Sequence, residues 1–527
     1  MSLHRLLGLI LAAPAFLLVA LEASPLGRRL RLERFVPRLL AAIAAGCLLF
    51  VAFLAYQHAR FPFALDLMEY PMLQHVMRAV RHQPIYVAAQ PGFVPFAYNP
   101  LFYFAAVPLV RIFGPGLLAL RLLTILGALG TVLVLFIAVS GRTGSRWWGL
   151  MAAGLFAAAY RVMDAYQDTV HSDPLMILAA LLGTWLIGRN RSRLWDWIGM
   201  LVLIAAFWFK QHGALFAMGG VSYLLWRDGW RRSWPFLMLA ALLGPALYLF
   251  AGRALFGPEF HYYTEAVPRS WSIFDAGTIL RPLAFFGRWY PLLLVSAVWF
   301  VLNRCAADWR KPSALLFQFP FAILTAFLGA LDPGSSNNVF VPLGVWLLLA
   351  GTLGFHAFAT HPGPWPHPRL ARLALLLSFA ALAYDPRSVL TSARAGAEAA
   401  DLVRVIRALP GTTYAPDLGQ PPGDLRFMPA AHWIALDDIM RGNARDSLVV
   451  EAVLAPALHP PGRAWLLTYR RLESYSCLRS LWPCYVMDTN LGERFLALEG
   501  LERRWPLGWP RFLYRYDPAA VAARNQP

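Results

Sequence analysis

The stretch AAIAAGCLLFVAFLA, residues 41–55, decides the fold class, because all fifteen of its side chains are apolar or small. Similar stretches recur to about residue 384, and the whole chain is 58% hydrophobic and 14% charged. A bilayer core needs roughly 20 apolar residues per helix, and only helices or closed barrels satisfy the backbone there. A barrel strand would alternate polar and apolar positions, which this stretch does not. The sequence therefore predicts an all-α polytopic membrane protein.

Arginine-rich connectors separate the apolar stretches and predict the topology. Of the 47 basic residues, 45 are arginine, and the net charge is +18. By the positive-inside rule, short connectors of this kind face the cytoplasm. Basic residues spread over short connectors do not resemble a nucleic-acid surface, so we exclude that function. The connectors are 27–38, 141–146, 189–193, 227–232, 303–311 and 367–372.

Placing these connectors inside predicts about twelve transmembrane helices, with both termini on the outer side. The expected spans are 6–23, 39–56, 116–139, 148–163, 174–188, 196–209, 211–226, 233–250, 284–302, 314–330, 338–357 and 369–384.

The outer side is then expected to carry three large segments. They are a first loop over 57–99, a second loop over 251–283 and a tail over 385–527. In the tail, hydropathy falls and Pro, Gly and charged residues become frequent, so we divide the chain into a membrane module (1–384) and a soluble α/β extracytoplasmic domain. Cys477 and Cys484 lie in that tail. The sequence leaves open whether they form a disulfide or are two small buried side chains.

With this topology, polar residues near the span ends gather on the outer side of the membrane. Ionisable groups at membrane depth are costly and by default suggest function. The residues are Asp66, Glu69, Asp164, Asp168, His171, Asp173, Lys210, Gln211, His212, Glu259, Glu265, Asp332, Asn337 and Asn338.

Several of these residues also have a purely structural interpretation. Asp66 and Glu69 are three positions apart and could form a capping box for an amphipathic helix over 70–81. Asp173 precedes a proline at the start of a span, where an N-cap residue belongs. Lys210 could be a snorkelling side chain instead of a phosphate ligand. His361, His367, His432 and His459 have no metal-ligand spacing with one another and are expected to be structural or solvated.

The order of these motifs resembles the GT-C membrane glycosyltransferases, specifically the family 39 polyprenyl-phosphate-sugar-dependent mannosyltransferases and aminoarabinose transferases. The resemblance covers most of residues 50–360. The motifs that carry it are LDLMEYP (65–71), QPIYVAAQPGFVPFAYNPLFY (83–103) with Tyr98, Pro100 and Tyr103, Arg121, YQDTVHSDPLMI (166–177), FKQHG (209–213) and DPGSSNNVFVPL (332–343).

The resemblance implies a catalytic set of Asp66, Glu69 and Asp173, with Asp66 on the acceptor side. His171 stands where such sequences often have an arginine, two positions before the second acid, so permanent phosphate binding at that position is in doubt. The donor-binding set that we expect is Lys210, Gln211, Asp168, His171, Arg121, Tyr98, Asn337 and Asn338.

The implied reaction moves a sugar from a polyprenyl-phosphate donor to an acceptor hydroxyl at the extracytoplasmic face. A carboxylate would take the hydroxyl proton while a cation meets the departing phosphate, and direct displacement would invert the anomeric centre. The expected location is a bacterial inner membrane, and the partners are the lipid-linked donor, membrane lipids and a protein, lipid or glycan acceptor. We expect no cofactor, although Asp66, Glu69 and Asp173 are oxygen donors that a divalent ion could use.

Two other classes stay open from the residues alone. A transporter or flippase of lipid-linked sugars would also bury charges, although such proteins commonly show repeated halves, and no repeat is visible in this chain. A membrane scaffold that recruits a partner through its outer domain is the other alternative.

Overall fold

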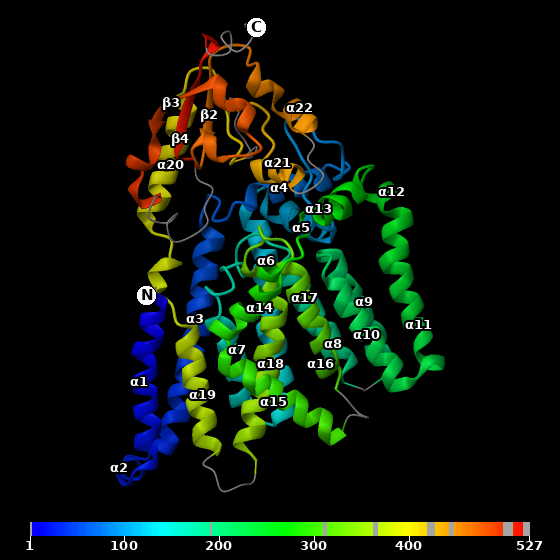
Figure 1. Cartoon of the computed structure of the whole chain (residues 1–527), viewed down its shortest axis with the longest axis vertical. Coiled ribbons are helices and arrows are strands. Elements are labelled where there is room, and N and C mark those ends of the chain that lie inside the picture. The colour runs from blue at the N-terminus through cyan, green and yellow to red at the C-terminus, as the bar shows by residue number, and fades with distance from the viewer. Residues whose placement is uncertain are drawn as a thin grey trace.

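The computed structural model describes residues 3–189, 192–308, 313–361, 367–418, 427–441, 447–498 and 510–519. A bundle of long helices forms the lower part of the molecule, and a small sheet with its own helices lies above one end of it (Figure 1). The helices of the first half are α1 (Leu3–Ala23), α2 (Pro25–Arg29), α3 (Leu32–Arg60), α4 (Glu69–Val80), α5 (Leu101–Phe113), α6 (Leu117–Thr143), α7 (Arg146–Ala158), α8 (Asp173–Ile187), α9 (Arg193–Phe209) and α10 (Gly213–Asp228).

The second half of the bundle is more broken, because proline and glycine interrupt it. The elements are α11 (Trp230–Ala241), η1 (Leu242–Ala251), α12 (Gly252–Phe256), η2 (Tyr262–Ala266), α13 (Val267–Trp271), α14 (Ala276–Trp289), α15 (Pro291–Asp308), α16 (Ala314–Phe317), α17 (Phe319–Ala330), η3 (Asn337–Phe340), α18 (Val341–Ala359) and α19 (His367–Leu382). Among them α18 is the central helix: nearly all of its residues are buried, and it contacts α6, α7, α15, α17 and α19.

Within the described ranges, four helical segments are long and apolar enough to cross a membrane, or up to six if each of two bent pairs is one span. They are Leu32–Arg60, Leu117–Thr143, Trp230–Phe256 and Asn337–Ala359. The membrane class is thus supported by the structure. The count of twelve stays a prediction, because helices such as α7 and α8 have only 13 and 15 residues.

The predicted continuous span over 284–302 is wrong. The helix ends at Trp289, and α14 and α15 meet at an angle of 104°. The break follows from Pro291, because a proline lacks the N–H for the helix ladder and its ring disfavours helical backbone at the preceding residue. Tyr290 accordingly leaves the helical region, at φ −126° and ψ 30°.

Two of the arginine connectors can be placed relative to the sheet. The short helix α2 and the turn between α10 and α11 lie at the end of the bundle farthest from the strands (Figure 1). This arrangement is the one that the positive-inside rule predicts if the sheet lies on the outer side.

Residues after α19 form an α/β unit. Its sheet has the order β1-β2-β4-β3, with β1 parallel to β2 and the other two pairs antiparallel. The strand β2 is buried along its whole length, and its sequence AWLLT is accordingly apolar up to the final Thr468. The elements are η4 (Pro386–Ser388), α20 (Ala393–Ala408), β1 (Thr412–Tyr414), α21 (Trp433–Met440), α22 (Ser447–Leu458), β2 (Ala464–Thr468), η5 (Leu472–Ser474), η6 (Arg479–Cys484), β3 (Tyr485–Asn490), η7 (Leu491–Glu493) and β4 (Phe512–Tyr516).

The question of a disulfide in this unit is resolved in favour of the thiols. Cys477 and Cys484 are both buried and are not bonded to one another. Their sulfur atoms face different backbone carbonyls, Trp433 O at 3.6 Å for Cys477 and Ser480 O at 3.9 Å for Cys484.

Candidate active site

The helix ends nearest the sheet, which we call the outer ends, converge beneath α21, and their polar residues meet there. The loop between α7 and α8 supplies Asp164, Tyr166, Asp168 and His171. It contains two consecutive residues in the left-handed region, Asp164 at φ 54° and Ala165 at φ 59°. Such backbone costs of order 1–3 kcal/mol per non-glycine residue and is held only by its surroundings. Here the Asp164 carboxylate provides the support, since it accepts bonds from the backbone N–H and the side-chain amide of Asn337.

Asp66 is paired with His171. The Nε2 atom of His171 lies 3.1 Å from Oδ1 of Asp66, and both side chains are buried. The backbone N–H of Met68 donates to the same carboxylate oxygen. The ring of Tyr166 packs on the His171 imidazole with centroids 3.9 Å apart, and its hydroxyl lies 3.0 Å from Ser336 Oγ. Asp66 is therefore oriented by residues from three segments.

The predicted helix over 70–81 is present as α4, but the predicted capping box is not. The N-cap residue is Met68, and no side chain caps the helix there. The carboxylates of Asp66 and Glu69 are used elsewhere instead. Asp66 and Glu69 are therefore not N-terminal caps of α4, and both side chains are buried in the interior of the molecule.

Lys210 and Asp173 form the second pair. The Lys210 ammonium donates to Asp173 Oδ1 at 2.7 Å, and both groups are buried. Lys210 has extended backbone, which ends α9 at Phe209 before α10 begins at Gly213. A side chain at Gly213 would lie 2.2 Å from the backbone of Ala206, so only glycine permits this tight reversal.

Two further residues, Asn338 and Tyr98, lie next to this ion pair. The Asn338 amide lies 3.5 Å from both oxygens of Asp173. The Lys210 ammonium also stands 5.7 Å from the centroid of the Tyr98 ring. The Asp173 carboxylate is thus committed to Lys210 and Asn338, and the N-cap interpretation is not supported, because the N-cap residue is Ser172.

Tyr98 interacts electrostatically with the carboxylates of both pairs. Burial raises the pKa of its hydroxyl above the usual range, and the charges of nearby carboxylates raise it further. These carboxylates are Asp173, Asp438, Asp66 and Asp332. The phenol therefore stays protonated near neutral pH and is a hydrogen-bond donor.

A further charged cluster joins the bundle to the α/β unit after α19, which we call the outer unit after its expected side of the membrane. Of its residues, only Asp332 was among the predicted polar residues. Arg441, which follows α21, bonds to Asp438 at 2.9 Å and to Asp332 at 3.2 Å. Its guanidinium stands 4.6 Å from the centroid of the Trp271 ring, and the Trp271 indole donates to the Asp438 carbonyl. We call Trp271, Asp332, Asp438 and Arg441 the arginine clamp. It joins α13, the loop before η3 and α21. The signal in the sequence was DDIMR (437–441), with an acid three positions before an arginine on a helix.

Comparison with solved structures identifies the fold. The structure of ArnT from Cupriavidus metallidurans in the apo state superposes with a TM-score of 0.52, covering 91% of this chain and 99% of that chain at 15% identity. The structure of the same protein bound to undecaprenyl phosphate superposes with a TM-score of 0.51, covering 90% and 98% at 15% identity. This chain has the ArnT fold. The expected resemblance to GT-C glycosyltransferases is thus confirmed at the level of the fold.

Sequence comparisons give shorter matches. The chain is 24% identical over 269 residues to the probable potassium transport system protein Kup of Bordetella pertussis, and equally to that of Bordetella parapertussis. The match covers 46% of this chain, and the chain spans about 38% of the length of these curated relatives. No family model matches the sequence. The match over almost the whole ArnT fold is therefore the more informative comparison.

Within the ArnT fold of this chain, Glu69 and Arg121 form a fully buried ion pair. Arg121 donates to Glu69 from Nε at 2.7 Å and from a terminal nitrogen at 2.5 Å. Its remaining donors go to the carbonyls of His58, Phe61 and Phe63. All five N–H donors of a guanidinium are thus used, and none is left for a phosphate. The assignment of Arg121 to donor binding is corrected: it holds the loop that carries Asp66.

Glu69 also helps to hold the loop that carries Asp66. Its oxygens also accept from the backbone N–H groups of Leu65 at 2.6 Å and Val170 at 3.1 Å. With both oxygens engaged by Arg121 as well, this carboxylate is a positioning group between the Asp66 loop and the His171 loop.

Three further predicted donor ligands also hold other parts of the protein. Asp168 accepts from the Tyr160 hydroxyl at 2.7 Å and lies 2.9 Å from His58 Nδ1. Gln211 donates to the carbonyls of Ala97 and Thr264. The side chain of Asn337 is bonded to Asp164, as described above. Of the expected donor-binding residues, those that the structure brings together around the two pairs are Lys210, His171, Tyr98 and Asn338.

The site contains two charged pairs that suit different chemical roles. Asp66 with His171 is a carboxylate next to a titratable partner, whereas Lys210 is a cation held beside Asp173 and Asn338. In the ranges that the structure describes, no group of three or more His, Cys, Asp or Glu side chains is arranged to hold a metal ion. The geometry suits proton removal at one end and stabilisation of an anion at the other.

Proposed function

We propose that this chain is a membrane glycosyltransferase that moves a sugar from a polyprenyl-phosphate donor to an acceptor hydroxyl, with inversion. The observation that carries the proposal is the pair of buried acid–base couples, Asp66 with His171 and Lys210 with Asp173, inside an ArnT fold. The structure of ArnT bound to undecaprenyl phosphate supports a lipid phosphate as the donor's anchor.

In the proposed reaction, the acceptor oxygen attacks the anomeric carbon as its proton passes to Asp66. The bond between the anomeric carbon and the phosphate oxygen breaks, and the polyprenyl phosphate leaves with the electron pair. Lys210 faces the charge that develops on this phosphate, and the neutral Tyr98 hydroxyl donates to it. An ammonium has three donors, and Asp173 accepts one of them, so the ion pair leaves Lys210 able to bind an anion.

We propose that the residues around Asp66 face the extracytoplasmic side of a bacterial inner membrane, and that the reaction needs no metal. Reporter fusions after residues 80 and 226 would test the orientation, since the proposal requires opposite compartments. A chelator should leave transfer unchanged. Activity lost on chelation and restored by one cation would overturn the metal-free reaction.

The proposal is tested by transfer from a labelled polyprenyl-phosphate sugar to a cell-envelope acceptor fraction, using purified protein. Asp66→Asn should lower the rate by about 100- to 10,000-fold, the usual contribution of a positioned base. Asp488→Asn, at an exposed position in β3, should leave it unchanged. An unaltered rate in Asp66→Asn would refute this assignment. Movement of the lipid-linked sugar across vesicles without a new glycosidic bond would instead show a flippase.

A further inference from the structure

His58, at the outer end of α3, faces two hydrogen-bond acceptors. Its Nδ1 atom lies 2.9 Å from a carboxylate oxygen of Asp168, and its Nε2 atom lies 3.0 Å from the backbone carbonyl oxygen of Val389. The ring is completely buried. The Tyr160 hydroxyl is 3.5 Å from Nδ1, but it gives its proton to the other oxygen of Asp168, at 2.7 Å. Because neither a carboxylate nor a carbonyl oxygen can donate, each of the two contacts needs a proton on the ring.

Two other buried histidines have a different set of partners. His75 and His432 each face a backbone carbonyl with one ring nitrogen and a backbone N–H with the other. A neutral ring, which has one N–H and one lone pair, satisfies both of these partners. Burial lowers the pKa of each of these rings to about 3, in agreement with a neutral state. The two acceptors of His58 instead require a doubly protonated ring.

The charges around His58 also favour a cationic ring. Arg121 donates to the His58 carbonyl at 2.7 Å and is paired with Glu69, so that four ionisable side chains form one buried set. With an imidazolium, His58 and Arg121 balance Asp168 and Glu69. With a neutral ring, the same buried set would carry a net negative charge, and an uncompensated buried charge is costly. Arg161, in the same loop as Asp168, is 29% exposed, so solvent screens its charge.

His58 joins two segments that are far apart in the chain. Asp168 belongs to the loop between α7 and α8, which also carries Asp164 and His171. Val389 belongs to the connector between α19 and α20, which leads into the outer unit. One imidazole ring thus holds the loop that builds the site and the segment that attaches the outer unit.

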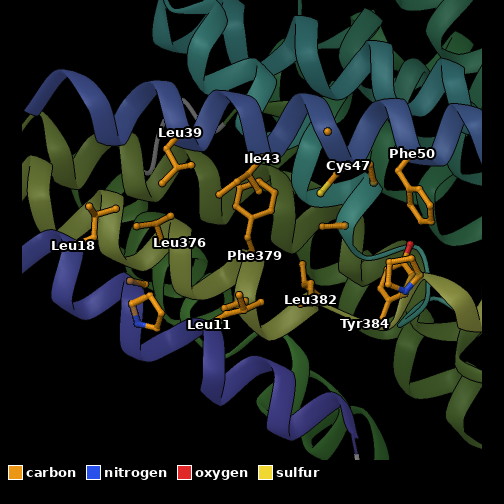
Figure 2. A pocket seen from close by; sticks show the side chains of 18 residues that line it. Leu11, Leu18, Leu39, Ile43, Cys47, Phe50, Leu376, Phe379, Leu382 and Tyr384 are labelled. Carbon is orange, nitrogen blue, oxygen red and sulfur yellow. The ribbon is translucent and has the colours of Figure 1, made fainter. Parts of the chain in front are cut away.

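The connector follows the outer part of α3. Before Val389, the ring of Tyr384 packs beside Phe50 of α3, with centroids 6.5 Å apart (Figure 2). After Val389, the carbonyl of Thr391 accepts from the Gln57 side chain at 3.4 Å. The connector is therefore anchored to α3 on both sides of the residue that His58 contacts.

We propose that His58 is a positioning residue held as an imidazolium, whose two N–H groups fix the His171 loop through Asp168 and the connector of the outer unit through Val389. A neutral ring can donate to only one of these acceptors, so one link would be lost. The charge state and the two links belong to the folded protein, and only the effect on transfer rests on the proposed function.

The charge of the ring is tested directly by solid-state NMR of the full-length protein in liposomes, with ¹⁵N in the histidine rings. The spectrum of the double variant His58→Asn/Asp168→Asn is subtracted to isolate the His58 signals. This variant removes both charges, so neither is left buried without a partner. We expect both ring nitrogens of His58 to carry protons at about pH 7. A neutral ring at this pH overturns the proposal.

Two single variants separate the two links. The amide nitrogen of an asparagine reaches roughly the place of Nδ1, and that of a glutamine roughly the place of Nε2. His58→Asn should therefore keep the bond to Asp168 and release Val389, whereas His58→Gln should do the reverse. Hydrogen–deuterium exchange of the full chain, followed by mass spectrometry over 159–172 and 385–392, measures both links.

We expect the exchange rate over 385–392 to rise roughly tenfold in His58→Asn, with 159–172 at the wild-type rate. His58→Gln should show the opposite pattern. His459→Gln, at an exposed position after α22, is the control and should change neither segment. Equal changes in both segments for both variants, or no change in either segment, overturn the proposal.

Sugar transfer by the same variants tests the positioning role. His58→Gln releases the His171 loop, so kcat should fall roughly 10- to 100-fold, the scale of a misplacement of about 1 Å. The KM for the polyprenyl-phosphate sugar should not change, since Lys210 lies outside this loop. His58→Asn should keep the wild-type kcat. An unaltered kcat in His58→Gln overturns the positioning role. If the wild type transfers no sugar, the proposed function fails, while the NMR and exchange results still decide the charge and the links of His58.

Discussion

Lys210 and Asp173 form an ion pair in a part of the site that water hardly reaches. Removing one partner of a buried ion pair costs about 3–5 kcal/mol, because the other charge is left without compensation. Lys210→Met should therefore lower the free energy of unfolding by about this amount and also abolish binding of undecaprenyl phosphate. Thermal unfolding and ligand binding measure the two effects separately.

The double variant Lys210→Met/Asp173→Asn separates stability from binding. Neutralising both partners removes the uncompensated charge, so most of the lost stability should return while binding stays absent. Arg231→Met, which removes an exposed cation in the first turn of α11, is the control and should change neither quantity. Recovery of binding in the double variant would show that Lys210 does not meet the phosphate.

The importance of a residue could be predicted when its charge near a membrane span was enough to mark it. It could not be predicted when the role depends on hydrogen-bond partners from distant segments. Asp66, Asp173 and Lys210 stood out because charged residues near membrane spans are costly, and the structure brings them to one place. Arg121 is equally costly, but its role depends on five acceptors from Glu69 and three carbonyls. No spacing in the sequence reveals that these acceptors surround it.

At the scale of elements, the Glu69–Arg121 pair joins α4 and α6 to the turn after α3. We expect Arg121→Lys to lower the free energy of unfolding by about 3–5 kcal/mol, since a lysine cannot supply five donors in a plane. The Kd of the folded fraction for undecaprenyl phosphate should stay unchanged, because all five N–H donors of Arg121 are already used within the protein. The control is Arg394→Lys in the exposed Arg394–Glu398 pair of α20, which should have little effect. A large rise in that Kd would contradict this interpretation and indicate that Arg121 contacts the lipid phosphate.

Element positions were predicted well in the first half of the chain, because uninterrupted apolar stretches fix helices such as α3 and α6. The bend between α14 and α15 was not predicted. The apolar residues there indicated one continuous span, but Pro291 breaks the helix. The reversal at Lys210 was predicted as a short connection between two spans. Its tightness depends on how closely Gly213 approaches Ala206, a contact that follows from packing and not from composition.

At the scale of the whole molecule, the outer unit shares its core with the membrane part. Leu54 and Leu65, near the outer end of α3, belong to the same cluster of buried residues as Leu402 in α20 and Leu467 in β2. The sequence predicted a separate domain because hydropathy drops after residue 384. Composition cannot show that this domain packs onto the outer ends of the helices.

The arginine clamp predicts that the outer unit contributes to transfer. Arg441→Ala removes its bonds to Asp332 and Asp438 and frees the loop that leads to Asn338. Misplacement of binding groups by about 1 Å can cost 100-fold, so we expect kcat/KM to fall roughly 10- to 100-fold with the fold intact. Arg404→Ala, in an exposed pair of α20, should have no effect. Unaltered kinetics in Arg441→Ala would show that the outer unit only covers the site.

Asp417 makes the stability of the outer unit depend on pH. Burial raises the pKa of its carboxyl to about 7, although the Tyr469 N–H and the Tyr475 hydroxyl donate to it. Because the folded pKa lies above the unfolded value, this contribution is fully present below about pH 4 and is lost as pH rises through about 7.

The expected loss for Asp417 is at most about 4 kcal/mol between these limits. Pulse proteolysis in urea at pH 5 and pH 8 measures it, with cleavage followed in residues 385–527. Asp417→Asn should flatten the pH dependence, whereas Asp488→Asn, at an exposed position, should keep it. An equal slope in wild type and Asp417→Asn would contradict this assignment.

The arginine clamp also limits how this protein can be recombined. A chimera that grafts the tail of a homologue after residue 384 would pair a foreign α21 with the resident Trp271 and Asp332. The two halves of the clamp would then come from different parents. Functional hybrids should arise when the segments around Trp271 and Asp332 travel with the tail, so the natural unit of exchange is discontinuous along the chain.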